Sequence, residues 1–191
     1  EIMDKIVVLL KNGFEEIEAL TIVDYLRRAD LTVELVSTEQ ELEVTGAHNI
    51  KIVADTIFED LNKEQIELIF LPGGMPGAES LSKDQKVLDL ISAHDKNGRP
   101  IAAICAAPIV LENAGVIKNK KVTSYPSFNK QLKSIAEYSE DLVYVDENII
   151  TSRGPATAVH LALELIELLK GRDKMQEIKS DILQDLVEKN N

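Results

Sequence analysis

The chain has 191 residues, 45% apolar and 28% charged, and this composition is typical of a globular protein that buries a core of its own. The formal net charge of −12 argues against direct binding to nucleic acid or to an anionic membrane surface, because both carry charge of the same sign. No apolar run approaches the roughly 20 residues of a membrane span, and the start "EIMDK" lacks a signal-peptide pattern.

Strands alternate with helices in the first half of the chain. Apolar runs of the kind buried on both faces of a parallel sheet occupy Lys5–Leu10, Leu31–Ser37 and Ile66–Leu71. Between the first two, "EEIEALTIVDYLRR" predicts a helix with glutamates at its positive end and arginines at its negative end. The segments "ELEVT" and "NIKIVAD" predict a small hairpin around Gly46.

The second half continues this alternation. Helices are predicted for "DQKVLDLISAHDKNG", for "APIVLENAG" and for "PATAVHLALELIELLKG", with glycines at their ends, and a last amphipathic helix for "RDKMQEIKSDILQDLVEK". The stretches "PIAAI" and "KVTSY" predict strands, and "LVYVDENIITS" predicts a hairpin turning at residues 146–148. The whole pattern predicts one domain over residues 1–191, a three-layer, flavodoxin-like α/β/α sandwich with a mostly parallel sheet.

Three polar or glycine-rich features follow strands of this predicted sheet. Asn12 and Gly13 follow the first strand, Gly73 and Gly74 follow "ELIFL", and Cys105 follows "PIAAI". Ligands bind beyond the carboxyl ends of strands in open α/β sheets, so the three features converge on one site if their strands are neighbours.

Cys105 is the only cysteine, and two interpretations of it stay open. At a bend into a helix, the field of the helix start favours the thiolate, and the alanines around it permit a tight turn. Packed among alanines, it is equally explained as inert core filling. A lone cysteine cannot form an intramolecular disulfide, which favours a reducing cytoplasm.

The remaining polar residues have simple structural explanations. The diglycine, Gly73 and Gly74, can offer N–H donors to an oxyanion or merely form a turn. The glutamates that open the first helix are most simply a solvated first turn, and periodicity selects none of them for the interior: Glu15, Glu16 and Glu18. Helix-surface ion pairs explain Asp24, Arg27 and Arg28. The histidines lack metal-ligand spacing, so no metal site is predicted: His48, His94 and His160.

Six motifs in order give the chain a resemblance to the ThiJ/PfpI family. They are "GFEEIEA", "LPGGMPGAE", "AAICAAP", "KVTSYP", "TSRGPATA" and "KGRDKMQE". The likeness covers essentially the whole chain and is greatest to the branch that holds the parkinsonism-associated protein and the bacterial chaperone YajL. It implies a flavodoxin-like fold, a homodimer and no cofactor.

The resemblance also implies roles for individual residues. Cys105 matches the family's reactive cysteine on a nucleophile elbow, and Glu18 matches its partner, a protonated carboxyl that hydrogen-bonds the sulfur. Backbone donors beside the sulfur match Gly73, Gly74 and Ala106. A loop near the site and the dimer contact matches Ser152, Arg153, Gly154 and Pro155, and Arg28 matches a position close to the dimer interface.

Two departures from the family pattern narrow the activity. The family's proteases place a histidine directly after the cysteine, where this chain has Ala106, which argues against a Cys-His protease. Many glyoxalase-active members carry a histidine before the proline of "KVTSYP", where this chain has Tyr125. Tyrosine, with an unperturbed pKa of about 10, is a poor proton carrier near neutral pH, although it can still hydrogen-bond a substrate oxygen.

The leading hypothesis from sequence is a cofactor-independent glyoxalase III-like or protein deglycase-like enzyme for methylglyoxal-type dicarbonyls or their protein adducts. Cys105 is its nucleophile and Glu18 its acid/base. One alternative is an oxidative-stress sensor or chaperone that uses oxidation of Cys105 without significant turnover. A further alternative is an inactive dimer that serves only as an interaction partner.

Overall fold

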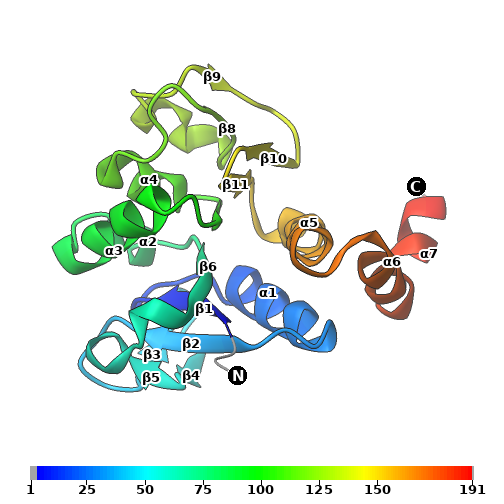
Figure 1. Cartoon of the computed structure of the whole chain (residues 1–191), viewed down its shortest axis with the longest axis horizontal. Coiled ribbons are helices and arrows are strands. Elements are labelled where there is room, and N and C mark those ends of the chain that lie inside the picture. The colour runs from blue at the N-terminus through cyan, green and yellow to red at the C-terminus, as the bar shows by residue number, and fades with distance from the viewer. Residues whose placement is uncertain (1–3, 191) are drawn as a thin grey trace.

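A computed structural model describes residues 4–190 and contains a central seven-stranded sheet in the order β10-β11-β7-β6-β1-β2-β5 (Figure 1). Every neighbouring pair is parallel except the antiparallel edge pair β10–β11. Most of the start "EIMDK" falls on residues 1–3, which lie outside the described residues. The strands of the sheet are β1 (Lys5–Leu10), β2 (Val33–Ser37), β5 (Thr56–Ile57), β6 (Ile66–Leu71), β7 (Ile101–Ile104), β10 (Val143–Asp146) and β11 (Ile149–Ser152).

Helices cover both faces of the sheet, which confirms the predicted three-layer sandwich (Figure 1). Alternate residues of β1 enter opposite cores: Val8 packs with the first layer of helices and Val7 with the second. The first layer contains α1 (Glu16–Arg28), α5 (Ala158–Lys170) and α6 (Arg172–Asp181). The second contains α2 (Gly77–Leu81), α3 (Gln85–Lys96) and α4 (Pro108–Ala114).

Two small sheets lie outside the central one. The predicted hairpin around Gly46 is confirmed, with β3 (Glu43–Thr45) antiparallel to β4 (Lys51–Val53). The predicted strand "KVTSY" is shorter than expected, because only β8 (Lys121–Val122) pairs, in parallel with β9 (Glu137–Tyr138). Short 3₁₀ turns lie between these elements at Phe58–Asp60, Lys63–Gln65, Pro126–Gln131 and Pro155–Thr157.

The sequence predicts a single C-terminal helix, and this prediction is wrong. The segment forms α6 and then α7 (Gln184–Lys189), and Leu183 between them has a left-handed φ of 63°. An L-residue at positive φ cannot continue a right-handed helix, although the amphipathic pattern runs on past it. Among the described residues, no helix has the length and apolar character needed to cross a membrane.

Candidate active site

The three features that follow strands in the sequence converge at one edge of the sheet. The order β7-β6-β1 makes their strands neighbours. Gly73 lies between Cys105 and Glu18, because a Cβ built on it would stand 2.7 Å from both Cys105 Cβ and Glu18 Oε2. Only glycine fits there, so the diglycine is more than a turn: its lack of side chains lets the carboxyl reach the thiol.

Cys105 occupies a strained bend between β7 and α4. Its φ of 63° lies in the left-handed region, which costs a non-glycine residue roughly 1–2 kcal/mol. The end of β11 and the segment after β8 hold the bend, because the Cys105 N–H donates to Ser152 O (3.0 Å) and its carbonyl accepts from Tyr125 N (2.9 Å). Pro108 begins the helix directly after the bend. The half-buried thiol is thereby fixed at the edge of the sheet.

Glu18 is fully buried beside this thiol. Its Oε2 accepts a hydrogen bond from Gly73 N (2.8 Å), and its own N–H donates to Glu15 Oε2 (2.8 Å). Its Oε1 has no hydrogen-bond partner within residues 4–190. A buried carboxyl with one unsatisfied oxygen is typical of a functional group rather than of a structural one.

The interpretation of the first turn of α1 as solvated is wrong. Glu15, Glu16 and Glu18 are 8%, 3% and 0% exposed. Two loops cover this turn: Gly73 O accepts from Glu15 N (2.9 Å), and Phe14 O accepts from Ala47 N (2.8 Å). Since both loops come from distant parts of the chain, helical periodicity alone could not place these side chains.

Burial raises the pKa of Glu18 from 4.5 to about 7. The Cys105 thiol and the Gly73 N–H oppose this rise, and the negative charge of Glu15 adds to it. Near neutral pH the carboxyl is therefore divided between its protonated and ionised forms, as a group that both accepts and donates protons must be.

Burial also raises the pKa of the Cys105 thiol, and the charge of Glu18 raises it further. The N–H groups of Ala106 and Gly74 point at the sulfur and act in the opposite direction. The sequence predicted that the field of the helix start would favour the thiolate. Burial and the Glu18 carboxylate raise the pKa of the thiol by more than that field lowers it. Because like charges so close oppose each other, the two groups titrate as one coupled pair.

The backbone donors divide into two roles. The N–H groups of Gly74 and Ala106 face the sulfur, as the resemblance implies, whereas the Gly73 N–H is bound to Glu18. Gly74 has a φ of 91°, and a Cβ there would lie 2.3 Å from Glu15 N. Gly74 is thus required for the close approach of this loop to the start of α1.

Tyr125 is joined to the cysteine bend through its backbone. It is 46% exposed, and a Cβ added to Gly154 would lie 3.6 Å from its ring. Its backbone N–H supports the Cys105 carbonyl, and its exposed side chain leaves the phenol open to solvent. It can thus present a hydroxyl to a bound molecule.

Ser152 and Arg153 support the site from beside it. The Ser152 hydroxyl donates to Leu142 O (2.6 Å), and its carbonyl receives the Cys105 N–H. The Arg153 guanidinium donates to Glu140 O (3.1 Å). These side chains hold loops in place, and Pro155 then starts the 3₁₀ turn that leads into α5.

Arg28 lies at the opposite end of α1 from Glu18. Its Nε donates to Asp24 Oδ2 (2.7 Å), and both side chains are about half exposed. The predicted surface ion pair is therefore present. Arg27 instead reaches Asp55 Oδ2 (3.2 Å) on the loop before β5.

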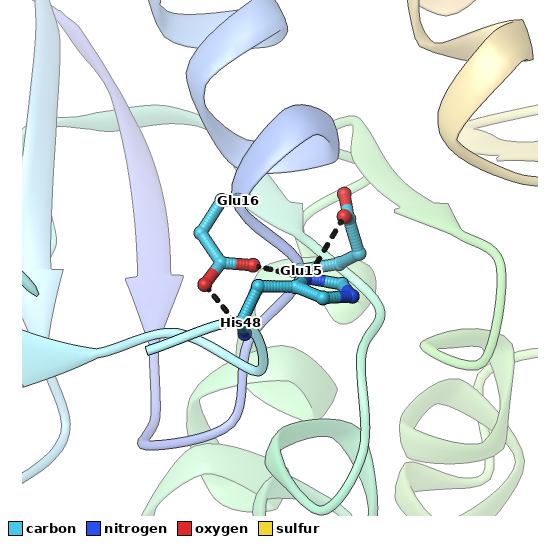
Figure 2. Close-up of side chains that lie close together, drawn as sticks. All are labelled: Glu15, Glu16 and His48. Carbon is cyan, nitrogen blue, oxygen red and sulfur yellow. Dashed lines mark hydrogen bonds and ion pairs between the residues drawn. The ribbon is translucent and has the colours of Figure 1, made fainter. Parts of the chain in front are cut away.

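A cluster of Glu15, Glu16 and His48 was missed by sequence reasoning. Oxygen and nitrogen atoms of the three side chains lie within 4.8 Å of one another at the start of α1 (Figure 2). Glu16 Oε2 lies 2.8 Å from His48 Nδ1, although the two residues are 32 positions apart. No spacing rule could find this contact, because His48 comes from the turn of the β3–β4 hairpin. Of the other histidines, His94 is buried and has its pKa lowered by burial.

The sequence matches the DJ-1/PfpI family over residues 4–168. Protein dj-1beta of Drosophila melanogaster is 38% identical over 177 residues, which cover 92% of this chain and 95% of that protein. The Caenorhabditis elegans protein named glutathione-independent glyoxalase DJR-1.2 is 31% identical over 173 residues, 91% of this chain and 92% of that protein. The chain spans less than half the length of two Arabidopsis thaliana DJ-1 homologues, 41% of homologue B and 46% of homologue A.

Solved structures agree with this assignment. The crystal structure of Drosophila melanogaster DJ-1beta superposes with a TM-score of 0.91 at 36% identity, covering 95% of this chain and 98% of that one. Oxidized Toxoplasma gondii DJ-1 gives 0.90 at 35% identity, covering 94% and 98%. With the fold and the matched residues 4–168 in agreement, the chain belongs to the DJ-1/PfpI family.

Proposed function

We propose that this protein is a cofactor-independent, cysteine-dependent enzyme that acts on methylglyoxal-type dicarbonyls or on their adducts with protein amines. The observation that carries the proposal is the pairing of Cys105, on a strained elbow, with a buried Glu18 whose pKa is raised to about 7. Such a pair supplies a nucleophile and a proton carrier in one place. The name of the Caenorhabditis elegans relative, a glutathione-independent glyoxalase, supports this class of substrate.

The first step joins the sulfur of Cys105 to the aldehyde carbon of methylglyoxal. The thiol proton passes to the ionised Glu18, the S–C bond forms, and the carbonyl π electrons move onto the aldehyde oxygen. The N–H groups of Gly74 and Ala106, which already face the sulfur, stabilise that developing oxyanion. Glu18 then returns the proton to the oxygen, which gives a hemithioacetal.

The second step moves a hydrogen between the two substrate carbons. Glu18 removes the proton from the former aldehyde carbon and delivers a proton to the ketone oxygen, and an enediol forms. Protonation of the second carbon and loss of the enol proton convert this intermediate to a thioester. Water then cleaves the thioester, releasing lactate and regenerating the Cys105 thiol, so the net reaction adds one water to methylglyoxal.

Lactate production from methylglyoxal tests this proposal. We expect Cys105→Ser and Glu18→Gln each to lower the rate by about 100-fold or more, since each removes a group that takes part in proton transfer or bond formation. Glu164→Gln is the matched control, because burial also raises the pKa of Glu164, which is half-buried and lies on α5. Equal rates in the wild type and all three variants would refute the proposed activity.

A redox sensor or stress chaperone is the second candidate, and the protonated form of Glu18 favours it. A carboxyl that donates a hydrogen bond stabilises a Cys105 sulfinate, formed from the thiol and two molecules of hydrogen peroxide with release of two waters. Mass spectrometry after mild peroxide should show two added oxygens on Cys105. Oxidation confined to methionines would contradict this role, whereas chaperone action through an apolar surface alone should survive Cys105→Ala.

We also propose a homodimer that works in a reducing compartment such as the cytoplasm. Apolar side chains are exposed around the start of α1 and on the adjoining hairpin: Ile17 (57%), Leu20 (39%), Ile50 (52%) and Val53 (69%). Ile50 N donates to Glu16 Oε1, which places the hairpin against α1. Contact between two copies would cover this surface, and a reducing environment would keep Cys105 as the thiol that catalysis requires.

A further inference from the structure

Glu15 closes a ring of hydrogen bonds beside the thiol. Its Oε2 accepts from Glu18 N (2.8 Å), and its own N–H donates to Gly73 O (2.9 Å). Gly73 N in turn donates to Glu18 Oε2 (2.8 Å). Glu15 therefore holds both the backbone of Glu18 and the glycine that separates this carboxyl from Cys105.

The peptide group between Gly73 and Gly74 links Glu15 to the sulfur. Its carbonyl accepts from Glu15 N, and its N–H faces the sulfur of Cys105. Hydrogen bonds in such a chain polarise one another, so the bond from Glu15 strengthens the donor at Gly74. The residue that caps α1 thus fixes one of the two N–H groups that we propose hold the oxyanion.

The Glu15 side chain also brings a buried charge close to Glu18. It is 10% exposed and occupies the positive end of α1, which stabilises a carboxylate. Within residues 4–190, the only basic side chain within 4.0 Å of it is His48. His48 Nδ1 lies 2.8 Å from Glu16 Oε2 but 3.7 Å from Glu15 Oε1, so the imidazole pairs more closely with Glu16 (Figure 2).

Two titratable side chains act on Glu18 from the elements around it. Glu15 comes from the start of the same helix and Cys105 from the bend after β7, whereas α5 packs in the same core with apolar side chains: Leu161, Ala162 and Leu165. The negative charge of Glu15 adds to burial in raising the pKa of Glu18. Removal of that one charge should therefore favour release of the proton.

We propose that Glu15 is a positioning residue for the reaction at Cys105, an assignment that rests on the proposed function. Its carboxylate caps α1 so that Glu18 meets the thiol, and its negative charge keeps a proton on the Cys105–Glu18 pair near neutral pH. Glu15 acts through Glu18 and touches no reacting atom. It keeps Glu18 able to donate a proton as well as to accept one, which acid–base catalysis requires.

Two substitutions separate the charge of Glu15 from its cap. Glu15→Gln removes the charge and keeps an amide oxygen to accept from Glu18 N, whereas Glu15→Ala removes both. Glu16→Gln is the matched control, because Glu16 is an equally buried carboxylate on the same turn whose side chain bonds to His48. Circular dichroism checks the folding of each protein.

The pH dependence of iodoacetamide labelling at Cys105 is the first measurement, because it does not require turnover. We expect the first midpoint to fall by about half a pH unit or more in Glu15→Gln and Glu15→Ala, and to stay within about 0.2 unit in Glu16→Gln. Glu15→Ala should also melt about 2–4 °C lower, because it loses the cap. The rate of lactate production from methylglyoxal should shift along the pH axis by the same amount as the labelling.

Each result decides the assignment. A lower midpoint in both Glu15 variants, with an unchanged midpoint in Glu16→Gln, supports it. Equal midpoints in wild type and Glu15→Gln, or an equal shift in Glu16→Gln, overturn it and leave Glu15 as a helix cap alone. If wild type makes no lactate, the proposed activity fails, and the labelling midpoints still decide whether Glu15 controls the proton of the pair.

Discussion

Glu18 is fully buried, and its Oε1 has no hydrogen-bond partner within residues 4–190. Desolvation penalises the charged carboxylate more than the neutral acid, so burial raises its pKa to about 7. The thiol of Cys105 lies beside this carboxyl, and burial raises the pKa of the thiol as well. At the scale of single residues, the site therefore consists of two acids that compete for one negative charge.

The raised pKa of Glu18 makes stability depend on pH with a definite sign. Between pH 4.5 and about 7 the folded protein holds a proton on Glu18 that the unfolded chain has released. Since the folded state binds more protons there, its stability falls as pH rises through this window, by about 3 kcal/mol in total. In Glu18→Gln this loss should be absent.

Urea unfolding of both proteins at about pH 4 and about pH 8 measures the effect. The variant's stability relative to wild type should improve by about 3 kcal/mol from the lower to the higher pH. Comparing two pH values cancels any fixed cost of the substitution. A pH-independent difference would show that Glu18 titrates normally in the folded protein.

The sequence predicted the bend at Cys105 but not the burial of the glutamates, and both outcomes have physical reasons. The cysteine follows a short apolar strand and precedes Pro108, so its place at a strand-to-helix bend is encoded locally. The burial of Glu15 and Glu16 depends on the β3–β4 turn, which packs against them. His48 of this turn contacts Glu16, although the two residues are 32 positions apart in the sequence. Choosing Glu18 as the partner of the thiol came from the family resemblance and not from periodicity.

At the scale of elements, the site is built from strand ends and the loops that follow them. The loop after β6 brings Gly73 against Glu18, and the bend after β7 brings Cys105 against Gly73. Apolar runs and glycines mark the beginnings and ends of these elements in the sequence, so most of their ends were predicted closely. Short strands such as β8 were less predictable, because their length depends on the partner strand more than on their own residues.

The break between α6 and α7 gives a prediction about stability. Leu183 has a φ of 63° and is 60% exposed, so it bears backbone strain without burying much surface. Leu183→Gly should stabilise the protein by about 1 kcal/mol, since glycine adopts this conformation freely.

Leu186→Gly is the matched control, because Leu186 is similarly exposed (56%) but lies inside α7. It should destabilise by up to about 1 kcal/mol. Urea midpoints of the three proteins measure both changes. Destabilisation by Leu183→Gly would mean that the chain continues as one helix through residue 183 in solution, as the amphipathic pattern predicts.

At the scale of the whole molecule, the parallel sheet gathers catalytic candidates from three separate segments. The sheet extends on both sides of β1, with β6 and β7 on one side and β2 on the other, so right-handed crossovers place helices on both faces. Alternating apolar strands and helices predicted this architecture from sequence. The role of the exposed apolar residues of α1 and β4 could not be predicted in this way, because a sequence pattern does not distinguish a surface residue from an interface residue.

The proposed homodimer gives a prediction at this scale. Light scattering after size exclusion should give twice the mass of a single chain, and Val53→Lys should shift the protein toward monomer by burying a charge at the contact. Leu168→Lys, an exposed position on α5 (52%), should leave the mass unchanged. A wild-type protein with the mass of one chain would contradict the dimer.

The most direct test of the shared proton between Cys105 and Glu18 is the pH dependence of iodoacetamide labelling at the sulfur. In wild type, we expect labelling to rise first with a midpoint near 7, where the pair loses one proton, and again at much higher pH. In Glu18→Gln the first rise should vanish, because the thiol then titrates alone with a pKa raised by burial. Identical single-step curves in both proteins, with an ordinary midpoint of about 8.5, would contradict a coupled pair.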